Sequence, residues 1–295
     1  RYVYVAVNER INDIWVPRIY GPGNIPSEMT DGRKDSGIEA MGMDENRNLY
    51  AVGWQENSKR TMFAVYWKNC SVVMLTDSTQ NVFGIATGIT TSGDDVYISG
   101  YMAKNGHTNA VYWKNEELIE LTSGENDAHT ADIFVHGEDV YVTGSEKNSN
   151  NVYEARLWKN GVMQKMNGHY TASVYANEGY VYVTGDFGPG KYWHNGAYKS
   201  LGNVEGDGTA HVQVHNNSVY MTTSGKYWKD GVSVDLKANL FSLAVFKDDV
   251  YLGGSQFENS KGTYVARYWK NGKAVDLTDG TNNAHAGDIV VVSTE

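Results

Sequence analysis

The chain has 295 residues, with 35 acidic and 25 basic side chains and a formal net charge of −10. Apolar residues make up 41% of it and charged residues 20%, which are values of a globular protein and exclude general disorder. No run of about 18 apolar residues is present, so no membrane-spanning segment is expected, and an acidic chain without basic blocks excludes nucleic acid as the expected partner.

An internal repeat explains the high content of aromatic residues and glycine. In chain order, a degenerate copy at Ile19-Tyr20 is followed by six Trp-centred copies: Tyr66-Trp67-Lys68-Asn69, Tyr112-Trp113-Lys114-Asn115, Leu157-Trp158-Lys159-Asn160, Tyr192-Trp193-His194-Asn195, Tyr227-Trp228-Lys229-Asp230 and Tyr268-Trp269-Lys270-Asn271. A second motif, an apolar stretch with tyrosine at a fixed place, recurs in step at Tyr4, Tyr50, Tyr97, Tyr141, Tyr182, Tyr220 and Tyr251. The two motifs together predict seven units of roughly 42 residues each.

Each unit contains four strand signals separated by turn residues. From the centre outwards we expect an inner strand A rich in small residues, strand B with Val-Tyr-Val, strand C ending in Tyr-Trp, and strand D after an Asn-Gly type of turn. The A strands are expected to begin near Ile38, Gly84, Ala131, Ala172, Ala210, Ser242 and Gly287. No stretch has helical periodicity of useful length.

This pattern predicts an all-β, seven-bladed β-propeller with four antiparallel strands per blade, formed by residues 1–295 as a single domain. The chain opens with a B strand, Val3 to Val7, and ends with an A strand, Asp288 to Val292. One blade is therefore expected to be shared by the N-terminal strands and the C-terminal strand, which closes the ring. The repeated aromatic residues are interpreted as the packing between neighbouring blades.

The two faces of such a ring differ in the loops that they carry. The A–B and C–D turns are short and nearly uniform, whereas the B–C and D–A loops vary in length from unit to unit. Variable loops on a constant scaffold are the usual place of a binding site, so the loop face is the expected ligand face. Neutral variation of exposed loops is the alternative.

Seven residues on the loop face are candidates for ligand binding. His129 and His285 occupy equivalent places just before strand A, and His169 and His211 are expected close to the matching place in two other units. The others are the aromatic residues outside the repeated core positions, Trp15, Trp54 and Tyr101. Exposed aromatic rings of this kind stack on sugars or anchor a protein partner. Trp15 has counterparts at Tyr153 and Tyr264, so a packing role for Trp15 remains open.

No catalytic residue, metal site or cofactor is predicted. Catalytic and nucleotide-binding motifs are absent, the four histidines lack a metal-binding spacing, and Cys70 is the only cysteine. The acids that occur on the loop face in single units form no recognisable catalytic set; they are Glu125, Asp127, Asp186, Glu205 and Asp207. An enzyme is therefore less favoured than a binding protein.

The repeated pattern Asp-Val-Tyr-Val-x-Gly, Ala-x-Tyr-Trp-Lys-Asn-Gly and Leu-Thr-Asp-Gly, seen most fully at 249–281, resembles repeats of uncharacterised bacterial envelope and secreted proteins, notably Bacteroidetes lipoproteins. The resemblance covers nearly the whole chain, transfers no catalytic residue, and implies export to the cell surface or the medium, with any lipid anchor supplied by a segment outside this sequence. The favoured hypothesis is a non-catalytic exported propeller that recognises a glycan or a protein on its loop face. The alternatives are a polysaccharide hydrolase or lyase with its site at the channel mouth, and a structural subunit of a cell-surface complex.

Overall fold

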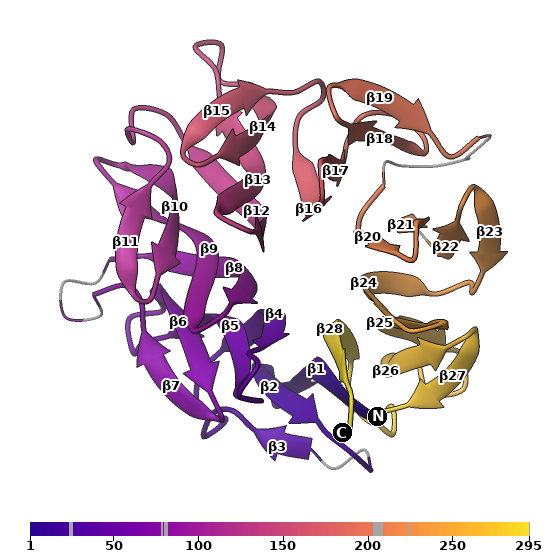
Figure 1. Ribbon diagram of the computed structural model, residues 1–295. Helices are drawn as coiled ribbons and strands as arrows, with labels where there is room; N and C mark the ends of the chain where they lie inside the picture. Colours follow the sequence, from indigo (N-terminus) through magenta and orange to yellow (C-terminus); the bar gives the residue numbers. More distant parts are fainter. Residues whose placement is uncertain (24–25, 78, 80–81, 203–208, 224, 295) are drawn as a thin grey trace.

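Short alternating segments that end at turn residues cannot form helices of useful length, and the chain folds entirely into strands and their connections. The computed structural model describes residues 1–23, 26–77, 79, 82–202, 209–223 and 225–294. These residues form seven four-stranded antiparallel sheets, which surround a central channel as the blades of a β-propeller (Figure 1). Within this described part of the chain there is no helix that could cross a membrane. The predicted fold class is confirmed.

The blades are numbered in the chain order of their B strands. From blade 1 to blade 7, the inner A strands are β28 (Ala284–Val292), β4 (Ser36–Met43), β8 (Gly84–Ser92), β12 (Ala128–His136), β16 (Thr171–Asn177), β20 (Val212–His215) and β24 (Asn239–Phe246). The B strands are β1 (Tyr2–Ile11), β5 (Leu49–Glu56), β9 (Asp95–Lys104), β13 (Asp139–Lys147), β17 (Tyr180–Gly185), β21 (Ser218–Thr223) and β25 (Asp249–Glu258).

The outer half of each blade follows the same order. The C strands are β2 (Ile14–Tyr20), β6 (Met62–Lys68), β10 (His107–Lys114), β14 (Tyr153–Lys159), β18 (Lys191–His194), β22 (Lys226–Lys229) and β26 (Thr263–Lys270). The D strands are β3 (Pro26–Glu28), β7 (Ser71–Met74), β11 (Glu117–Glu120), β15 (Val162–Lys165), β19 (Ala197–Ser200), β23 (Val232–Asp235) and β27 (Lys273–Asp276).

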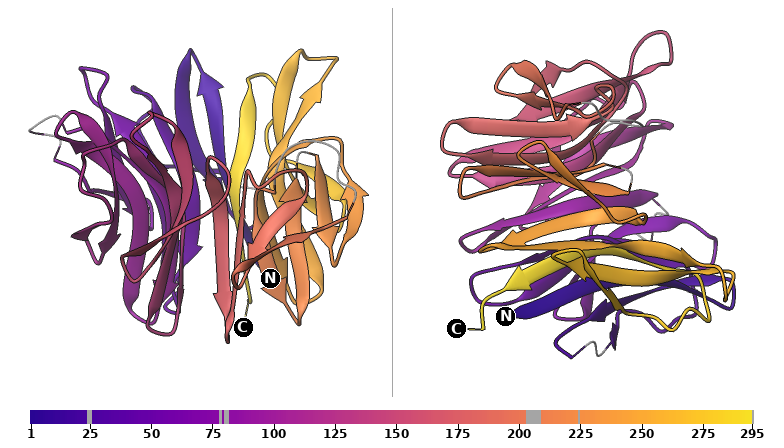
Figure 2. Two further views of the ribbon diagram at one scale, coloured as in Figure 1. Left: turned by 90° about the horizontal axis from the view of Figure 1, so that it is seen from above. Right: turned by 90° about the vertical axis from the view of Figure 1, so that its right-hand side faces the viewer.

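The ring is closed by strands from the two ends of the chain. β28 pairs with β1 in antiparallel register, with Val5 opposite Ile289, and β2 and β3 complete this blade. The two termini consequently lie side by side in all three views (Figures 1 and 2). The shared closing blade predicted from the sequence is confirmed, and pairing with β1 protects an edge of β28 that would otherwise be open.

The repeat motif is explained by contacts at the turns, as blade 4 illustrates. Asn160 has a φ of 49°, its Oδ1 accepts a hydrogen bond from the Val140 amide at 2.8 Å, and its Nδ2 donates one to Asp139 at 2.8 Å. Lys159 Nζ lies 2.8 Å from Asp139 and 5.3 Å from the ring centroid of Tyr141. The same bond from the turn side chain to the first part of strand B recurs at Asn69, Asn115, Asn195, Asp230 and Asn271. The uniform motif residues on this face therefore fix the turns.

The tryptophans of the C strands form the packing between blades. They are all buried: Trp67, Trp113, Trp158, Trp193, Trp228 and Trp269. Trp113 of blade 3, for example, shares one apolar cluster with Tyr50 and Tyr66 of blade 2. In blade 1, Tyr20 lies opposite Val5, the position that tryptophan takes in the other blades. Since a buried aromatic side chain removes about 150–250 Å² from water, these contacts hold neighbouring blades together.

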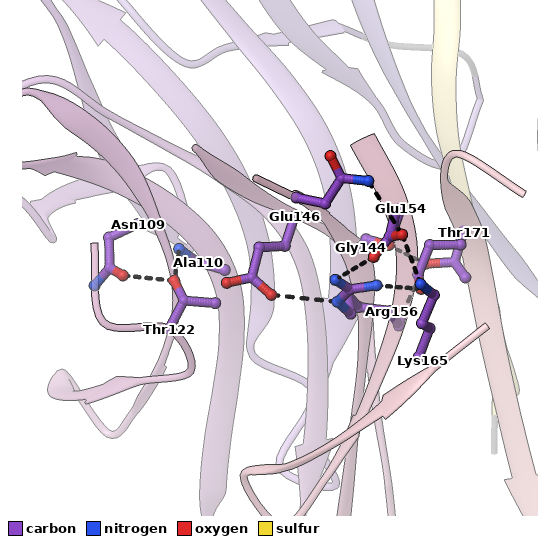
Figure 3. Close-up of polar contacts among 11 residues, drawn as sticks. Asn109, Ala110, Thr122, Gly144, Glu146, Glu154, Arg156, Lys165 and Thr171 are labelled. Carbon is purple, nitrogen blue, oxygen red and sulfur yellow. Dashed lines mark hydrogen bonds and ion pairs between the residues drawn. The ribbon is translucent and has the colours of Figure 1, made fainter. Parts of the chain in front are cut away.

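Polar contacts also join blades 4 and 5 near the loop face (Figure 3). Arg156 is buried and lies 3.2 Å from Glu146 and 2.9 Å from Glu154, whose other oxygen lies 2.6 Å from Lys165. Lys165 and then Arg156 lower the pKa of Glu154 to about 2. The Thr171 hydroxyl of blade 5 donates to the Arg156 carbonyl at 3.1 Å. This cluster holds the middle of β14 against the start of the next inner strand.

The inner strands differ from the prediction in where they begin. In blades 1, 2, 4 and 7 they start two to three residues earlier than expected, because residues before a bulge still pair with strand B. In blade 4, for example, Thr130 and Asp132 have consecutive partners in β13, so Ala131 is an extra, unpaired residue. Such bulges place one residue of each of these strands on the channel wall.

Candidate ligand-binding site at the channel mouth

The centre of the loop face is hollowed into a pocket of about 560 Å³. It opens into the central channel, where a second cavity of about 380 Å³ shares part of its lining. Blades 1, 2, 6 and 7 contribute the large and polar side chains of its wall, among them Asn8, Trp15, Glu39, His211, Phe241, Tyr264 and His285. The pocket therefore lies on the face that the loop variation predicts.

The bulges determine what this pocket presents to a ligand. The bulged residue is small in most blades, as at Thr87, Ala131, Ala172 and Gly287. Blade 2 has Glu39 at this place and blade 7 has Phe241, and both line the pocket. The bulged residues around the channel are therefore mostly small, and the two large ones add a carboxylate and a phenyl group to the pocket.

Glu39 projects into the pocket from β4 and is held from one side. The Trp54 indole Nε1 donates a hydrogen bond to its Oε1 at 3.0 Å. The side chain of Glu39 is exposed to the pocket, but the surrounding protein partly desolvates the carboxylate, and this raises its pKa. Tyr101 of blade 3 lies near it: burial and then the Glu39 charge raise the pKa of Tyr101 to about 12. Trp54 and Tyr101 are therefore linked to the site through Glu39.

His285 lies in an aromatic cluster on the opposite part of the wall. Its ring centroid is 5.3 Å from that of Trp15 and 5.5 Å from that of Phe241, both edge-on. Its Nε2 lies 3.3 Å from Asn8 Nδ2, and Asn8 also exchanges two hydrogen bonds with the backbone of Ile38. Burial lowers the pKa of His285. The neutral imidazole therefore acts as part of an apolar wall near neutral pH.

His129 repeats this arrangement in blade 4. Its ring centroid is 4.5 Å from that of Tyr101 and 5.4 Å from that of Tyr153, and its ring nitrogen lies 3.2 Å from the hydroxyl of Thr108. Burial lowers its pKa as well. His129 and His285 are equivalent in register, as predicted, but both lie inside the A strands and not before them. Both histidines belong to the A strands because residues before the bulge still pair with strand B.

The other two histidines do not join this pair. His169 is 68% exposed and its Nδ1 lies 3.0 Å from Asp186; Tyr170, and not His169, is the residue that precedes the paired Thr171. His211 comes directly before Val212 and takes the place that Asp132 has in blade 4. It lines the pocket, and burial lowers its pKa to about 4. His169 and His211 thus lie close in sequence to the matching place but do not occupy it, and only His129 and His285 share one register position.

The aromatic equivalences predicted for Trp15 are confirmed. Trp15 pairs with Arg10, Tyr153 with Lys147 and Tyr264 with Phe257, which are the same place in three blades. The Arg10 guanidinium lies 5.6 Å from the Trp15 ring centroid. Trp15 and Tyr264 both line the pocket, so this place contributes to packing and to the pocket wall at once.

Two carboxylates lie deeper in the channel. Asp288 accepts hydrogen bonds from the Met41 amide at 2.6 Å and from its neighbour Ile289 at 2.8 Å. Asp132 accepts one from Val174 at 3.1 Å, again an amide of the next blade. Burial raises the pKa of both, that of Asp288 to about 7. These acids join adjacent inner strands, and their oxygens are occupied by backbone donors.

Within the described ranges, no three His, Cys, Asp or Glu side chains come together as a metal site. Glu205 and Asp207, two of the acids considered from the sequence, lie outside the described residues. Asp127 forms an ion pair with Lys147 at 2.9 Å and accepts a hydrogen bond from the Thr108 amide at 3.1 Å. Lys147, and to a smaller extent Thr108, lower the pKa of Asp127 to about 2. The arrangement at the mouth offers aromatic faces, one carboxylate and polar groups for binding.

Sequence reasoning missed Glu39, Phe241 and Tyr264 as pocket residues. Strand A was recognised as rich in small residues, and Glu39 and Phe241 are the two bulky exceptions to that composition at the bulge. Comparing the seven copies column by column would have found them. The sequence indicates Tyr264 only as the counterpart of Trp15.

Fold and site together define a β-propeller with a pocket at the mouth of its channel. A scan against protein-family models and a search of curated proteins each gave no match. Similar solved structures include an acylaminoacyl peptidase from Pyrococcus horikoshii (TM-score 0.52, 14% identity, 95% of this chain and 51% of that one) and the β-propeller domain of the Trilobed protease from Pyrococcus furiosus (TM-score 0.51, 12% identity, 95% and 92%). TolB from Acinetobacter baumannii matches with a TM-score of 0.47 at 10% identity, over 98% of this chain and 65% of that one.

The first two similarities show the fold alone. The chain spans about half the length of the peptidase. The Trilobed protease domain is described as having an open velcro topology, whereas β28 and β1 are paired here.

Proposed function

We propose that this propeller is a non-catalytic binding protein that recognises a glycan in the mouth pocket. The observation that carries the proposal is the convergence of Trp15, Phe241 and Tyr264 around one pocket that also contains the Glu39 carboxylate. Phe241 is 38% exposed and Tyr264 is 41% exposed, so both rings present surface to the pocket. Sugar recognition needs this combination, because the apolar face of the ring packs on an aromatic side chain while the hydroxyls require polar partners.

The pocket's size and place support the same function. Its volume falls within the range of about 300–1,000 Å³ that is typical of small-molecule sites. It lies at the centre of the face with variable loops, on a scaffold whose repeated contacts leave the inner strands little freedom. A rigid, largely preformed pocket loses less conformational entropy on binding than a mobile surface.

We also propose that the protein acts outside the cytoplasm. The resemblance of its repeats to those of bacterial envelope and secreted proteins supports this location. Fractionation of cells that express the full-length gene product, followed by immunoblotting, tests it. Recovery in the cytoplasmic fraction alone would contradict export.

A glycan array tests the binding function. We expect the wild-type protein to bind a restricted set of glycans, and Trp15→Ala and Phe241→Ala to lose at least about tenfold in affinity, as expected for the loss of an aromatic contact of a few kcal/mol. Tyr180→Ala is the matched control, because Tyr180 is 51% exposed at the start of β17, after the A–B turn on the opposite face.

Each other outcome has a clear meaning. If no glycan binds, the sugar proposal fails and a protein ligand or a structural subunit takes its place. If a bound glycan is cleaved, as seen by chromatography of the products, the protein is a hydrolase or lyase and the non-catalytic proposal fails.

A further inference from the structure

No cationic side chain of the described residues forms an ion pair with the Glu39 carboxylate. Among the described residues, its hydrogen-bond partner is the neutral indole of Trp54, and the ion pairs of the structure involve other acids. The acids on the opposite face, which carries the A–B and C–D turns, differ from Glu39 in this respect. Asp95, Asp139 and Asp249 each lie within 3.1 Å of a lysine Nζ. Glu39 thus lies in a cavity without the cationic partner that these three turn acids have.

An uncompensated carboxylate in a partly desolvated pocket lowers stability unless something binds it. The raised pKa of Glu39, caused by burial and only partly offset by Trp54, reflects this cost. The Trp54 bond uses one side of one oxygen, so Oε2 and the remaining lone pair of Oε1 are open to a ligand. The ligand that best removes the cost is a cation.

The surroundings favour an organic cation over a metal ion. Calcium and magnesium require several oxygen ligands, and no group of three potential ligands occurs in the described part of the chain. Phe241, Trp15 and His285 instead provide an aromatic wall in the same pocket. Aromatic faces attract ammonium groups, and a single carboxylate is sufficient to pair with one.

We propose that the mouth pocket selects glycans with a free amino group, whose ammonium pairs with Glu39 while the sugar ring packs on Phe241 and Trp15. This inference rests on the proposed glycan binding and specifies its substrate class. Glu39 is the residue that distinguishes an amino sugar from its N-acetylated or neutral counterpart, because acetylation removes the positive charge and enlarges the group.

Isothermal titration calorimetry with two probes of equal length tests it: the hexasaccharide of glucosamine and the hexasaccharide of N-acetylglucosamine, at about pH 6, well below the pKa of about 8 of an α-amino group. We expect the wild-type protein to bind the glucosamine hexasaccharide about tenfold or more tightly, as is typical of a hydrogen-bonded charged group. Glu39→Gln keeps the shape and the acceptor for Trp54, and it should reduce this preference to within about twofold. Glu138→Gln, which removes the same charge from an A–B turn on the other face, should leave it unchanged.

The outcomes separate this inference from the proposed function. If both hexasaccharides bind equally, or if Glu39→Gln keeps the preference, the amino-sugar inference is wrong while glycan binding stands. If neither hexasaccharide binds and the glycan array is also negative, glycan binding itself is wrong and the inference falls with it. A preference that disappears only in Glu39→Gln supports both.

Discussion

The indole of Trp54 donates its hydrogen bond to the Glu39 carboxylate at 3.0 Å across the first two strands of blade 2. Trp54 lies opposite Gly37 in the sheet, and Gly37 comes two residues before the bulged Glu39 in β4. The indole of Trp54 therefore extends across β4 to reach Glu39. The contact leaves the other carboxylate oxygen for a ligand. Trp54 therefore acts as a positioning residue, through Glu39.

Replacement of Trp54 by phenylalanine tests this role. Trp54→Phe keeps an aromatic ring but removes the N–H donor, so the carboxylate loses its fixed orientation. We expect the affinity for the glucosamine hexasaccharide to fall by about three- to tenfold, as for one hydrogen bond to a charged group, and the affinity for the acetylated probe to change little.

A double variant separates positioning from general damage to the pocket. In the Glu39→Gln background, Trp54→Phe should have little further effect on the ratio of the two affinities, because the charge that it orients is gone. Additive losses in calorimetry would show that Trp54 contacts the ligand independently of Glu39.

Gly37 provides the space in which the Trp54 ring lies. A Cβ atom added at Gly37 would be 2.8 Å from Trp54 Nε1, so the indole would have to move. We expect Gly37→Ala to reduce the preference for the amino sugar about as much as Trp54→Phe, although residue 37 does not line the pocket. The affinity ratio by calorimetry and a near-ultraviolet circular dichroism spectrum measure this; an unchanged ratio would mean that the ring can shift without losing its bond.

The propeller fold could be predicted from the sequence because residues that repeat in the sequence have the same physical role in each blade. Trp158, Tyr141 and Asn160 each have one role in packing or in a turn, and similar residues repeat that role in nearly every other blade, so the repeat predicts seven blades and the closing blade. Trp15 was matched correctly to Tyr153 and Tyr264 for the same reason. Repetition is the signal, and it reports what the blades share.

The candidate site was only partly predictable, because a site in a ring is formed by what the blades do not share. Glu39 and Phe241 are single departures from a small-residue position, and their meaning depends on bulges that shift the register of the inner strands. His169 lies one residue before the place that corresponds to His129, a difference that only the register of the paired strands reveals. Depth along the channel axis cannot be read from spacing alone when loops differ in length.

The turn motif can be tested through Asn160. Asn160→Ala removes the two side-chain hydrogen bonds to Val140 and Asp139. It also puts alanine, which has no side-chain polar group to stabilise a left-handed backbone, at a φ of 49°. We expect a loss of about 1–3 kcal/mol in the free energy of unfolding, measured by denaturant titration. Asn160→Gly loses the same bonds but tolerates the backbone, so it should be less destabilising by about 1 kcal/mol. Equal losses in both variants would assign the whole effect to the hydrogen bonds.

Asp288 should make the stability of the ring depend on pH. Its pKa is about 7 in the folded protein because of burial, against an ordinary value of 3.8, and the charge of Asp132 acts in the same direction. The folded state therefore holds the proton more tightly than the unfolded state. The stabilisation is fully present below about pH 4 and is lost as the pH rises through 7. His211, with a pKa of about 4, stays neutral from pH 5 to 8, whereas burial also raises the pKa of two other channel acids, Glu39 and Asp132.

Denaturant titrations of the wild type and Asp288→Asn between pH 5 and 8 measure this effect. Three pKa units would correspond to about 4 kcal/mol, but the carboxyl faces the open channel, so we expect the wild type to lose about 1–2 kcal/mol more than Asp288→Asn over this range. Asp94→Asn, which removes an exposed acid at an A–B turn, serves as the control. Parallel curves for the wild type and Asp288→Asn would show that water in the channel solvates the carboxylate fully. A steeper wild-type curve would show that ionisation of the buried Asp288 carboxyl lowers the stability of the ring.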